Sequence, residues 1–372
     1  MYKINEKRFG QRFILLFLML WFIGCMSSGD KLQRGHPASY YYLQGLEHLK
    51  TSQNKRAEND FERALELDAH YAPAHEGLGR IFLGEDRLYE AALHVNRAIQ
   101  LDSIWMPALL LKGRIELCKG NYEKAVAILQ ETIAKARELK ALENKNQLTA
   151  SALFWIGVSR YEQGNWEEAE RILEKFLQLK PSNKKANMYY QKAKQNSRLL
   201  MGKSDGVRTL AAQKVLTRGQ LAALFYETLL PVLPPTDDSF RIIVKDITWQ
   251  DPLYEVFQEL SQRGLLETYP DSTFKPQRPA ERGDLVLLLG RLLQQTMPDT
   301  LTGSPKIYTD VARVYPFFAY VNRLVVLNIL PSVSEHTFMP HRVLSGLEAL
   351  MAIEKTKKVL KTAGQNLNRN MQ

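Results

Sequence analysis

The chain has 372 residues, 45% of them apolar, which is enough for two or three domains with hydrophobic cores. Its formal net charge of +10 at pH 7 favours anionic partners. No aromatic–basic cluster or recognition motif accompanies this charge, so nucleic acid is not expected among the partners.

Residues 1–24 have the pattern of an export signal. Basic residues come first, namely Lys3, Lys7, Arg8 and Arg12. An unbroken apolar run follows, from 13 to 23. Such a run is too short to span a hydrocarbon core of roughly 30 Å and is typical of the centre of a signal peptide.

The apolar run ends in Phe22-Ile23-Gly24-Cys25, which resembles a bacterial lipobox. The resemblance implies cleavage after Gly24 and lipid attachment to Cys25, which anchors the mature chain in a membrane. Met26 then favours the outer membrane, on its periplasmic side, if the source is Gram-negative. An uncleaved signal anchor and a plain secretory signal are the alternatives. Cys118 is the other cysteine, so no intramolecular disulfide is expected once Cys25 is acylated.

A 34-residue period runs through residues 38–181. It relates small residues in successive copies, namely Gly45, Gly79 and Gly113, and Ala57, Ala91 and Ala125. A fourth copy, with Gly157 and Ala169, follows a short insertion. Repeats of this length are stacked pairs of helices, and the small residues allow the helices to approach closely. The pattern resembles the tetratricopeptide repeat, which implies a solenoid of helical hairpins.

In that family the first helix of each pair lines a concave groove. By register, the predicted groove residues of this chain include Tyr42, Arg80, Arg114, Phe154 and Tyr161. Arginines beside aromatic rings form a cradle for a peptide with an acidic or carboxylate group, so an unidentified protein partner is expected there. The alternative is that the arginines are solvated and that the apolar positions pack against neighbouring repeats.

A second and longer period follows the first. It relates Asp246 to Asp310, Phe274 to Phe338, Pro276 to Pro340, and Thr217 to Glu281 and Ser345. The stretches Tyr269-Pro270-Asp271-Ser272-Thr273-Phe274 and Glu281-Arg282-Gly283-Asp284 resemble the turn and the second-helix motif of the S-layer homology domain. Two fuller copies cover 243–294 and 307–355, and a degenerate first copy keeps the second-helix motif from Thr217.

The resemblance implies three units around a pseudo-three-fold axis, with cell-wall polysaccharide bound in grooves between them. Arg218 and Arg282 occupy the position of the motif arginine, whose guanidinium can hold a carboxylate with two hydrogen bonds. Together with Asp271 and Asp284 they are the predicted polymer-binding residues. An intramolecular ion pair, with Asp284 as a candidate partner, is the alternative for both arginines. Gly346 replaces the arginine in the last copy, so one pocket is expected to be altered.

Other motif residues are expected to be structural. Asp246 and Asp310 are predicted to brace turns, and Phe274 and Phe338 to anchor those turns in the core. Ser272 stands where the family pattern has glycine, so a positive φ there is expected to be mildly strained.

No catalytic constellation, cofactor fingerprint or metal-ligand spacing is found in the sequence. The chain lacks a Walker A loop and a zincin histidine pair, and His70 and His75 are not expected to form a metal site. Enzymatic activity is therefore not expected, and neither catalytic residues nor a cofactor are assigned.

The fold class predicted from these patterns is all-α, a helical-hairpin solenoid followed by a mainly helical repeat domain. The predicted segments are a leader (1–24), a lipidated tether (25–37), four tetratricopeptide repeats (38–181), a capping helix shared by both regions and begun by Ser182 (182–200), the S-layer homology region (201–358) and a frayed basic tail (359–372). The function expected is non-catalytic tethering in the cell envelope through lipid, wall polysaccharide or peptidoglycan, and a protein partner. The alternative is an envelope assembly or secretion scaffold in which both helical regions bind protein.

Overall fold

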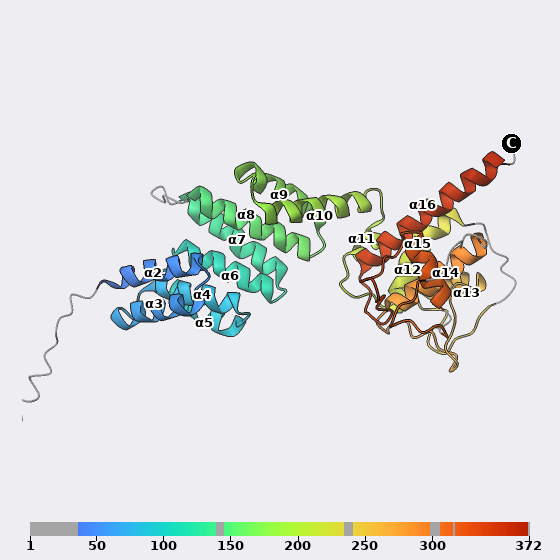
Figure 1. The fold of residues 1–372 in the computed structure, drawn as a ribbon, viewed down its shortest axis with the longest axis horizontal. Coiled ribbons are helices and arrows are strands. Elements are labelled where there is room, and N and C mark those ends of the chain that lie inside the picture. The colour runs from blue at the N-terminus through green and yellow to red at the C-terminus, as the bar shows by residue number, and fades with distance from the viewer. Residues whose placement is uncertain (1–35, 139–144, 234–240, 298–305, 315–316, 371–372) are drawn as a thin grey trace, which may run out of the picture. The chain divides into compact units, whose positions relative to one another are not determined.

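The computed structural model describes residues 36–138, 145–233, 241–297, 306–314 and 317–370 (Figure 1). Within these ranges the chain is all-α, as predicted, with helices α2 to α16 and no β-strand. The predicted leader, Cys25 and most of the tether lie outside the described residues. The chain divides into two compact units between Lys119 and Gly120. This division falls inside the predicted solenoid, and the segment boundaries read from the sequence stay predictions.

The first unit consists of helical hairpins. Helices α2 (Ala38–Lys50) and α3 (Asn54–Leu67) form one pair, and α4 (Ala72–Gly84) and α5 (Leu88–Leu101) form the next. Helix α6 (Met106–Cys118) packs against both α4 and α5. Short turns join the helices, so neighbours in sequence are neighbours in space.

Small residues at the 34-residue spacing bring the paired helices together, as the sequence predicts. A Cβ atom added to Gly45 would lie 2.5 Å from the ring of Phe61, and one added to Gly79 would lie 2.6 Å from Val95. Ala57 and Ala91 are fully buried. Since real Cβ contacts are longer than this, a larger residue at either glycine would separate its hairpin.

The second unit begins with four consecutive helices: α7 (Tyr122–Glu138), α8 (Lys145–Glu162), α9 (Trp166–Leu179) and α10 (Lys184–Leu200). Each packs against the next. Helix α10 is capped by Asn183, whose side chain accepts a hydrogen bond of 2.9 Å from the Ala186 amide, rather than by Ser182 as expected. Asn183 takes this role because its side-chain oxygen reaches the amide three residues on.

The remaining helices form the three-repeat region: α11 (Asp205–Ala211), α12 (Arg218–Leu229) with the short helix η1 (Leu230–Val232), α13 (Tyr254–Gln262), α14 (Arg282–Thr296), α15 (Phe318–Val326) and α16 (Gly346–Asn370). Helix α16 runs through the segment in which a frayed tail is expected after Lys358. Lysine, leucine and alanine in that segment favour helix.

Three backbone hydrogen bonds close the repeats into a ring. The Leu216 amide donates to the Leu344 carbonyl (2.9 Å), the Leu344 amide to the Ala280 carbonyl (2.9 Å), and the Ala280 amide to the Leu216 carbonyl (2.8 Å). These residues hold equivalent positions in the longer period and are fully buried. Three equivalent positions that bond in a cycle define a pseudo-three-fold axis, and the degenerate first copy therefore takes full part in it.

One hydrophobic core serves this region. It includes Phe257, Phe274 and Phe338, all 1% exposed or less, and Leu200 from the end of α10. Helix α10 packs along α9 and contributes Leu200 to this core, and its role as a shared helix stays a prediction. In the degenerate first copy, residues 205–211 precede the second-helix motif and form helix α11.

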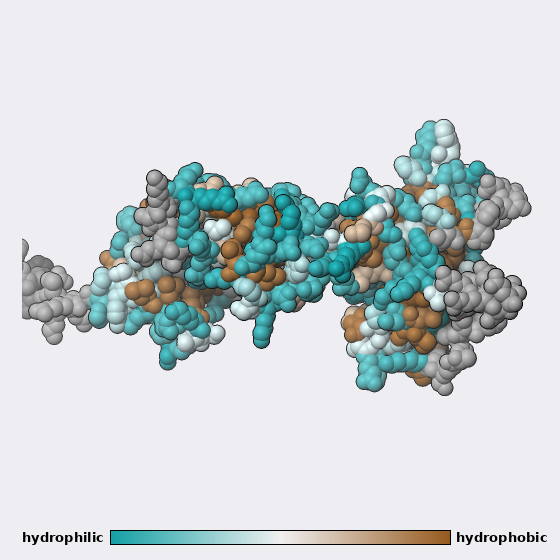
Figure 2. Space-filling view, turned by 90° about the horizontal axis from the view of Figure 1, so that it is seen from above, coloured by the Kyte–Doolittle hydropathy of each residue, from teal (hydrophilic) through white to brown (hydrophobic). Residues whose placement is uncertain are grey.

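The surface is mostly hydrophilic, with separate apolar patches (Figure 2). Exposed hydrophobic side chains of the repeat region include Ile243 (87%), Trp249 (76%) and Val314 (87%). Scattered exposed apolar residues are normal on protein surfaces and do not mark a site by themselves.

Candidate functional site

Matching turns lie at equivalent places in the two fuller repeats. The carboxylate of Asp246 accepts hydrogen bonds from the amides of Phe274 (2.8 Å) and Lys275 (2.6 Å). Asp310 does the same for Phe338 (3.0 Å) and Met339 (2.6 Å). The bracing role predicted for both aspartates is confirmed, and both phenylalanines are anchored in the core as expected.

The turns also contain residues in the left-handed backbone region. Lys275 and Met339 both have φ of +57°, and Ser272 has φ of +59°, as expected from the glycine it replaces. Non-glycine residues pay an energetic cost for this conformation, which the aspartate hydrogen bonds offset in the case of Lys275 and Met339. The turns are therefore held in a defined shape beside the repeat interfaces.

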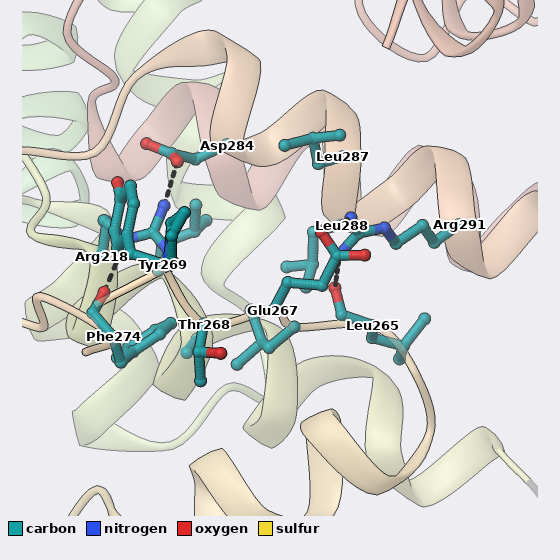
Figure 3. A pocket seen from close by; sticks show the side chains of 14 residues that line it. Arg218, Leu265, Glu267, Thr268, Tyr269, Phe274, Asp284, Leu287, Leu288 and Arg291 are labelled. Carbon is teal, nitrogen blue, oxygen red and sulfur yellow. Dashed lines mark hydrogen bonds and ion pairs between the residues drawn. The ribbon is translucent and has the colours of Figure 1, made fainter. Parts of the chain in front are cut away.

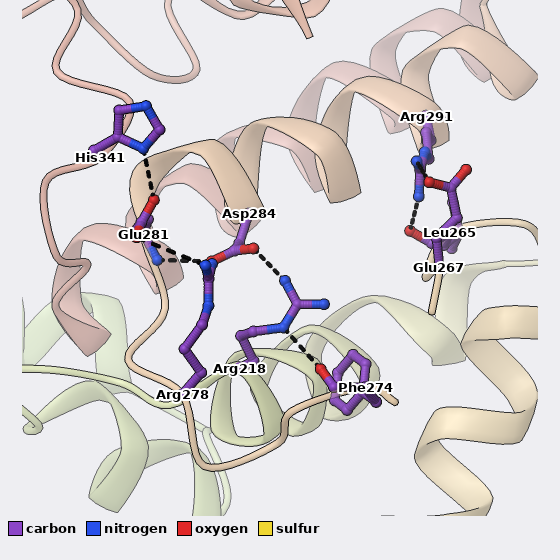
Figure 4. A network of polar contacts seen from close by, with 9 residues as sticks. All are labelled: Arg218, Leu265, Glu267, Phe274, Arg278, Glu281, Asp284, Arg291 and His341. Carbon is purple, nitrogen blue, oxygen red and sulfur yellow. Dashed lines mark hydrogen bonds and ion pairs between the residues drawn. The ribbon is translucent and has the colours of Figure 1, made fainter. Parts of the chain in front are cut away.

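The first junction lies between the first and second repeats and centres on Arg218, at the start of α12. Its Nε donates to the Phe274 carbonyl (3.0 Å), and Nη1 donates to Oδ1 of Asp284 (Figure 4). The guanidinium also lies 5.0 Å from the ring centroid of Tyr269. Asp284 accepts further bonds from Arg278 (2.8 Å) and from the Glu281 amide (2.8 Å). The ion-pair alternative therefore describes Arg218, with Asp284 as its partner.

The second junction, between the second and third repeats, has the same arrangement at the equivalent positions. Arg282 donates to Glu348 and, through Nη2, to the Pro331 carbonyl (2.8 Å). Its guanidinium lies 4.5 Å from the Phe338 ring centroid, and Arg342 also pairs with Glu348 (2.6 Å). Arg282 is thus in an ion pair, but with Glu348 and not with Asp284. In both junctions the acid that meets the motif arginine comes from the next repeat.

Burial distinguishes the two arginines. The side chain of Arg282 is 3% exposed, whereas that of Arg218 is 12% exposed. Burial lowers the pKa of the Arg282 guanidinium from its ordinary value, and the nearby Glu348 carboxylate opposes that shift. A guanidinium this enclosed braces the junction from within.

The third junction, between the third and first repeats, has no arginine at the motif position. The Gly346 amide donates to the Gln213 carbonyl (2.9 Å), and helix α11 packs against α16. A Cβ atom at Gly346 would lie 1.8 Å from the Leu210 carbonyl oxygen. The close approach of α11 excludes any side chain at position 346, so this junction differs from the other two.

A cavity of about 240 Å³ opens at the first junction (Figure 3). Helix α12, helix α14 and the turn of the second repeat line it with Arg218, Leu221, Ala222, Leu265, Leu266, Glu267, Thr268, Tyr269, Pro270, Phe274, Asp284, Leu287, Leu288 and Arg291. It combines apolar walls with a few charged groups, which is typical of small-ligand sites.

Two charged residues at this cavity were missed in the sequence. Arg291 donates through Nη1 to the Leu265 carbonyl (3.2 Å) and pairs through Nη2 with Glu267 (2.5 Å). Arg291 lies two helical turns after Asp284 on α14 and so shares its helix face, and this spacing is the signal that could have found it.

Asp271 is separate from the cavity lining. Its carboxylate accepts hydrogen bonds from the amide (3.1 Å) and hydroxyl (2.6 Å) of Thr273, inside its own turn. These hydrogen bonds lower the pKa of Asp271 from its ordinary value, and the bond from the Thr273 hydroxyl contributes most. Asp271 organises the turn, and its predicted contact with polymer stays a prediction.

Three predicted groove residues belong to the first unit. Tyr42 on α2 packs against the rings of Phe61 and Tyr71, at 5.9 Å between centroids in both cases. Arg80 on α4 donates to Glu76 through Nε (3.1 Å) and Nη2 (2.5 Å), and burial lowers the pKa of Arg114 on α6.

Glu76, which the sequence analysis did not single out, is fully buried. Burial raises its pKa, and the Arg80 and Arg114 guanidiniums oppose that shift. A buried carboxylate between arginines gives this face of the first unit a defined polar centre. Glu76 stands in the second copy where Tyr42 stands in the first, and this register is the signal that marks it as a groove position.

The other two predicted groove residues belong to the second unit, on α8. Phe154 and Tyr161 both face Tyr189 of α10, with ring centroids 6.3 Å and 5.3 Å away. Phe154 is only 8% exposed. The capping helix α10 therefore covers these positions, in line with the alternative that they pack against a neighbouring element.

Comparisons with known proteins agree with both repeat patterns. The family model described as tetratricopeptide repeat matches residues 42–103 and 110–184, and that of the S-layer homology domain matches residues 245–286. The chain thus contains tetratricopeptide repeats and an S-layer homology domain. Both are scaffold and binding modules without catalytic function of their own.

A curated relative, Cell surface glycoprotein 1 of Acetivibrio thermocellus, is 38% identical over 61 residues, or 16% of this chain. The match spans only 2% of that protein's length. Solved structures that resemble the chain include the pilF protein of Pseudomonas aeruginosa (16% identity, 71% of this chain, 93% of that one, TM-score 0.38). A thermophilic TPR protein of Thermus thermophilus is also similar (15% identity, 51% of this chain, 91% of that one, TM-score 0.34). Both scores are low, so neither likeness defines the fold of the whole chain.

Within the described ranges, no helix is long and apolar enough to cross a membrane. No group of three or more His, Cys, Asp or Glu side chains in that part of the chain could hold a metal ion.

Proposed function

We propose that this protein is a non-catalytic, lipid-anchored protein of the cell envelope that binds wall polysaccharide or peptidoglycan through its S-layer homology repeats. The single observation that carries the proposal is the cavity at the first junction, where Arg218 and Arg291 lie among apolar walls. Saccharides have both apolar C–H faces and polar edges, and a cavity lined in this way complements both. The cell-surface protein among the relatives supports the same location.

The tetratricopeptide repeats bind a protein partner in this proposal. Buried Glu76, its partner Arg80, whose side chain is 42% exposed, and the neighbouring Arg114 provide a polar centre against which a peptide can be oriented. The predicted groove is limited to the first unit here, because α10 covers Phe154 and Tyr161.

Lipid on Cys25 supplies the third attachment. Each bound partner raises the effective concentration of the chain near the others, so modest individual affinities together hold membrane, wall and protein partner in proximity. In a Gram-negative source the anchor places the protein on the periplasmic side of the outer membrane. Labelling cells with a tagged fatty acid tests the anchor, because wild type incorporates the label and Cys25→Ser does not.

Sedimentation of the purified chain, residues 26–372, with cell-wall sacculi of its own organism tests the wall contact. Thr268→Trp fills the cavity from its exposed rim and is expected to reduce co-sedimentation at least about tenfold, the effect of losing roughly 1.4 kcal/mol. Ser332→Trp, the equivalent change in the next repeat, is the matched control and is expected to bind like wild type. Circular dichroism verifies that both variants fold.

A second candidate function is an envelope assembly or secretion scaffold in which both regions bind protein. The observations that favour it are the burial of Arg282 and the closure of the third junction by α11, because both remove places where sugar could bind. Failure of the folded wild type to co-sediment with sacculi would contradict wall tethering and favour the scaffold.

A further inference from the structure

The two guanidiniums at the cavity differ in how firmly their acids are held. The Asp284 side chain is 10% exposed and accepts hydrogen bonds from Arg218, Arg278 and the Glu281 amide. The Glu267 side chain is 71% exposed and extends from the loop after α13 to meet Arg291. Figure 4 shows Asp284 and Arg291 at separate places on α14, each beside its own partner.

This difference decides which pair a ligand can open. Separating Arg218 from Asp284 would break an ion pair in which both side chains are nearly buried, at 12% and 10% exposed, which is costly. Glu267 is 71% exposed and returns to water when it leaves, and the incoming carboxylate pairs again with Arg291, which is 14% exposed. The exchange therefore costs little. The Leu265 carbonyl continues to accept a hydrogen bond from Nη1 of Arg291, 3.2 Å away. Nη2 and Nε of Arg291 can then donate to the two oxygens of a ligand carboxylate.

We propose that Arg291 is the residue that receives a ligand carboxylate in this cavity, and that Glu267 occupies its place until the ligand displaces it. This assignment rests on the proposed function, in which the cavity binds wall polymer. The ligand is an acidic sugar, since a neutral sugar gains nothing from the exchange. The cavity of about 240 Å³ lies below the roughly 300–1,000 Å³ of drug-sized pockets, so it accommodates one ring-sized unit.

The second junction lacks this exchangeable acid. Position 331, equivalent to Glu267, is proline, and its carbonyl is bound by Arg282 at 2.8 Å. Position 355, equivalent to Arg291, is a lysine that donates to the Asn328 carbonyl at 2.8 Å. In the first repeat the equivalent position is Glu227. The exchange therefore belongs to the first junction, and one acidic sugar binds per chain.

Titration with matched sugars, followed by ligand-observed NMR, tests the assignment. The pairs are glucuronic acid with glucose, and N-acetylmuramic acid with N-acetylglucosamine, because each pair differs by a carboxylate-bearing group. For wild type the acid is expected to bind about tenfold more tightly than its neutral partner, the gain of a charge-assisted contact. Arg291→Lys is expected to lose most of that ratio, since an ammonium cannot form the guanidinium's two-bonded contact.

Glu267→Gln provides the sharper result, because loss of binding is a common outcome of mutation and a gain is not. Without the competing carboxylate, affinity for the acid is expected to rise about threefold to fivefold, the value of an exposed ion pair. Affinity for the neutral sugar is expected to stay unchanged. Glu255→Gln is the matched control, since Glu255 is 73% exposed and pairs with Arg241 away from the cavity lining.

Either of two titration results would overturn the assignment: acid and neutral sugars that bind wild type alike, or an acid affinity of Glu267→Gln equal to that of wild type. Co-sedimentation with sacculi that Thr268→Trp abolishes but Arg291→Lys preserves would also overturn it, while the proposed wall tethering would stand. Absence of sacculus binding by wild type would instead contradict the tethering, and the sugar titration would still decide the role of Arg291.

Discussion

The first and second junctions of the repeat region have the same internal bonds but different accessibility. In both, an arginine at the start of a helix pairs with an acid of the next repeat and donates to a carbonyl, and a second arginine joins the acid. Yet the Arg218 side chain is 12% exposed beside a cavity and the Arg282 side chain is 3% exposed. The shared motif thus builds the interface, and other residues decide whether that interface can accept a ligand.

Those other residues lie at the rim. At the first junction Glu267 and Tyr269 face the cavity, whereas the equivalent residues of the second junction are Pro331 and Val333. The third junction goes further, because α11 packs where an arginine would otherwise stand. The repeats preserved the bonds that hold three units together and diverged where a ligand would bind.

The largest effect is expected from Gly346→Ala, which tests the closure of the third junction. The new methyl carbon would lie 1.8 Å from the Leu210 carbonyl oxygen, so α11 must move off α16. We expect a loss of about 3 kcal/mol or more in the free energy of unfolding, measured by urea denaturation. Gly84→Ala is the control, because nothing lies within 4 Å of its Cβ position and the helix gains from alanine. A stable Gly346→Ala variant would show that α11 is loosely held.

Arg282→Ala is expected to have the next largest effect. It removes one member of an enclosed ion pair and leaves the Pro331 carbonyl without this donor. A destabilisation of about 3 kcal/mol is expected in urea. Since Arg282 lies outside the cavity lining, sacculus binding by the folded fraction should stay as in wild type, and a selective loss of binding would argue against the contrast between junctions.

Arg218→Ala sharpens the same comparison and is expected to cost less, about 2 kcal/mol. Arg278 remains on Asp284, and the Arg218 side chain has more contact with solvent. The urea midpoints of the two arginine variants, measured side by side, check the order. Equal destabilisation would mean that the difference in burial carries no energetic weight.

The smallest expected effect is a pH dependence of stability, and it concerns the first unit and not the arginine junctions. The Nδ1 atoms of His75 and His94 lie 3.1 Å apart. Burial is the largest cause that lowers the pKa of each histidine, and for His75 the neighbouring His94 lowers it further. A lowered pKa means that the folded state binds fewer protons, so its contribution to stability is present above the unfolded pKa of about 6.5 and is lost as pH falls below it.

Denaturation of the first unit is therefore expected at lower urea as the pH falls from about 7 to about 5, and His75→Gln/His94→Gln should reduce this pH dependence. Circular dichroism at several pH values measures it. An unchanged pH dependence in the double variant would assign the effect to other groups.

Much of the fold could be predicted because its determinants are local. The regular row of glycine and alanine indicated the hairpins, and the aspartate and phenylalanine pairs indicated the turns. Helix α11 could not be read in this way, since a short segment without a strong apolar period gains its structure from α16. The capping of Phe154 and Tyr161 by Tyr189 is likewise a contact between helices.

The candidate site was predicted only in part. Arg218 and Asp284 were identified and do line the cavity, whereas Arg282 and Asp271 lie elsewhere, and Arg291 and Glu267 were missed. Motif reading finds residues that recur, and the rim residues do not recur between repeats.

By itself the sequence determined the helical class, the two periods and the braced turns, because these depend on spacing and side-chain type along short stretches of chain. Only the tertiary structure decided which acid meets each arginine, that Leu216, Ala280 and Leu344 close a ring, and that the first junction keeps a cavity. Those outcomes depend on burial and on partners in different repeats. Contacts between residues so far apart in sequence form only when the whole domain packs, so short stretches of sequence do not reveal them.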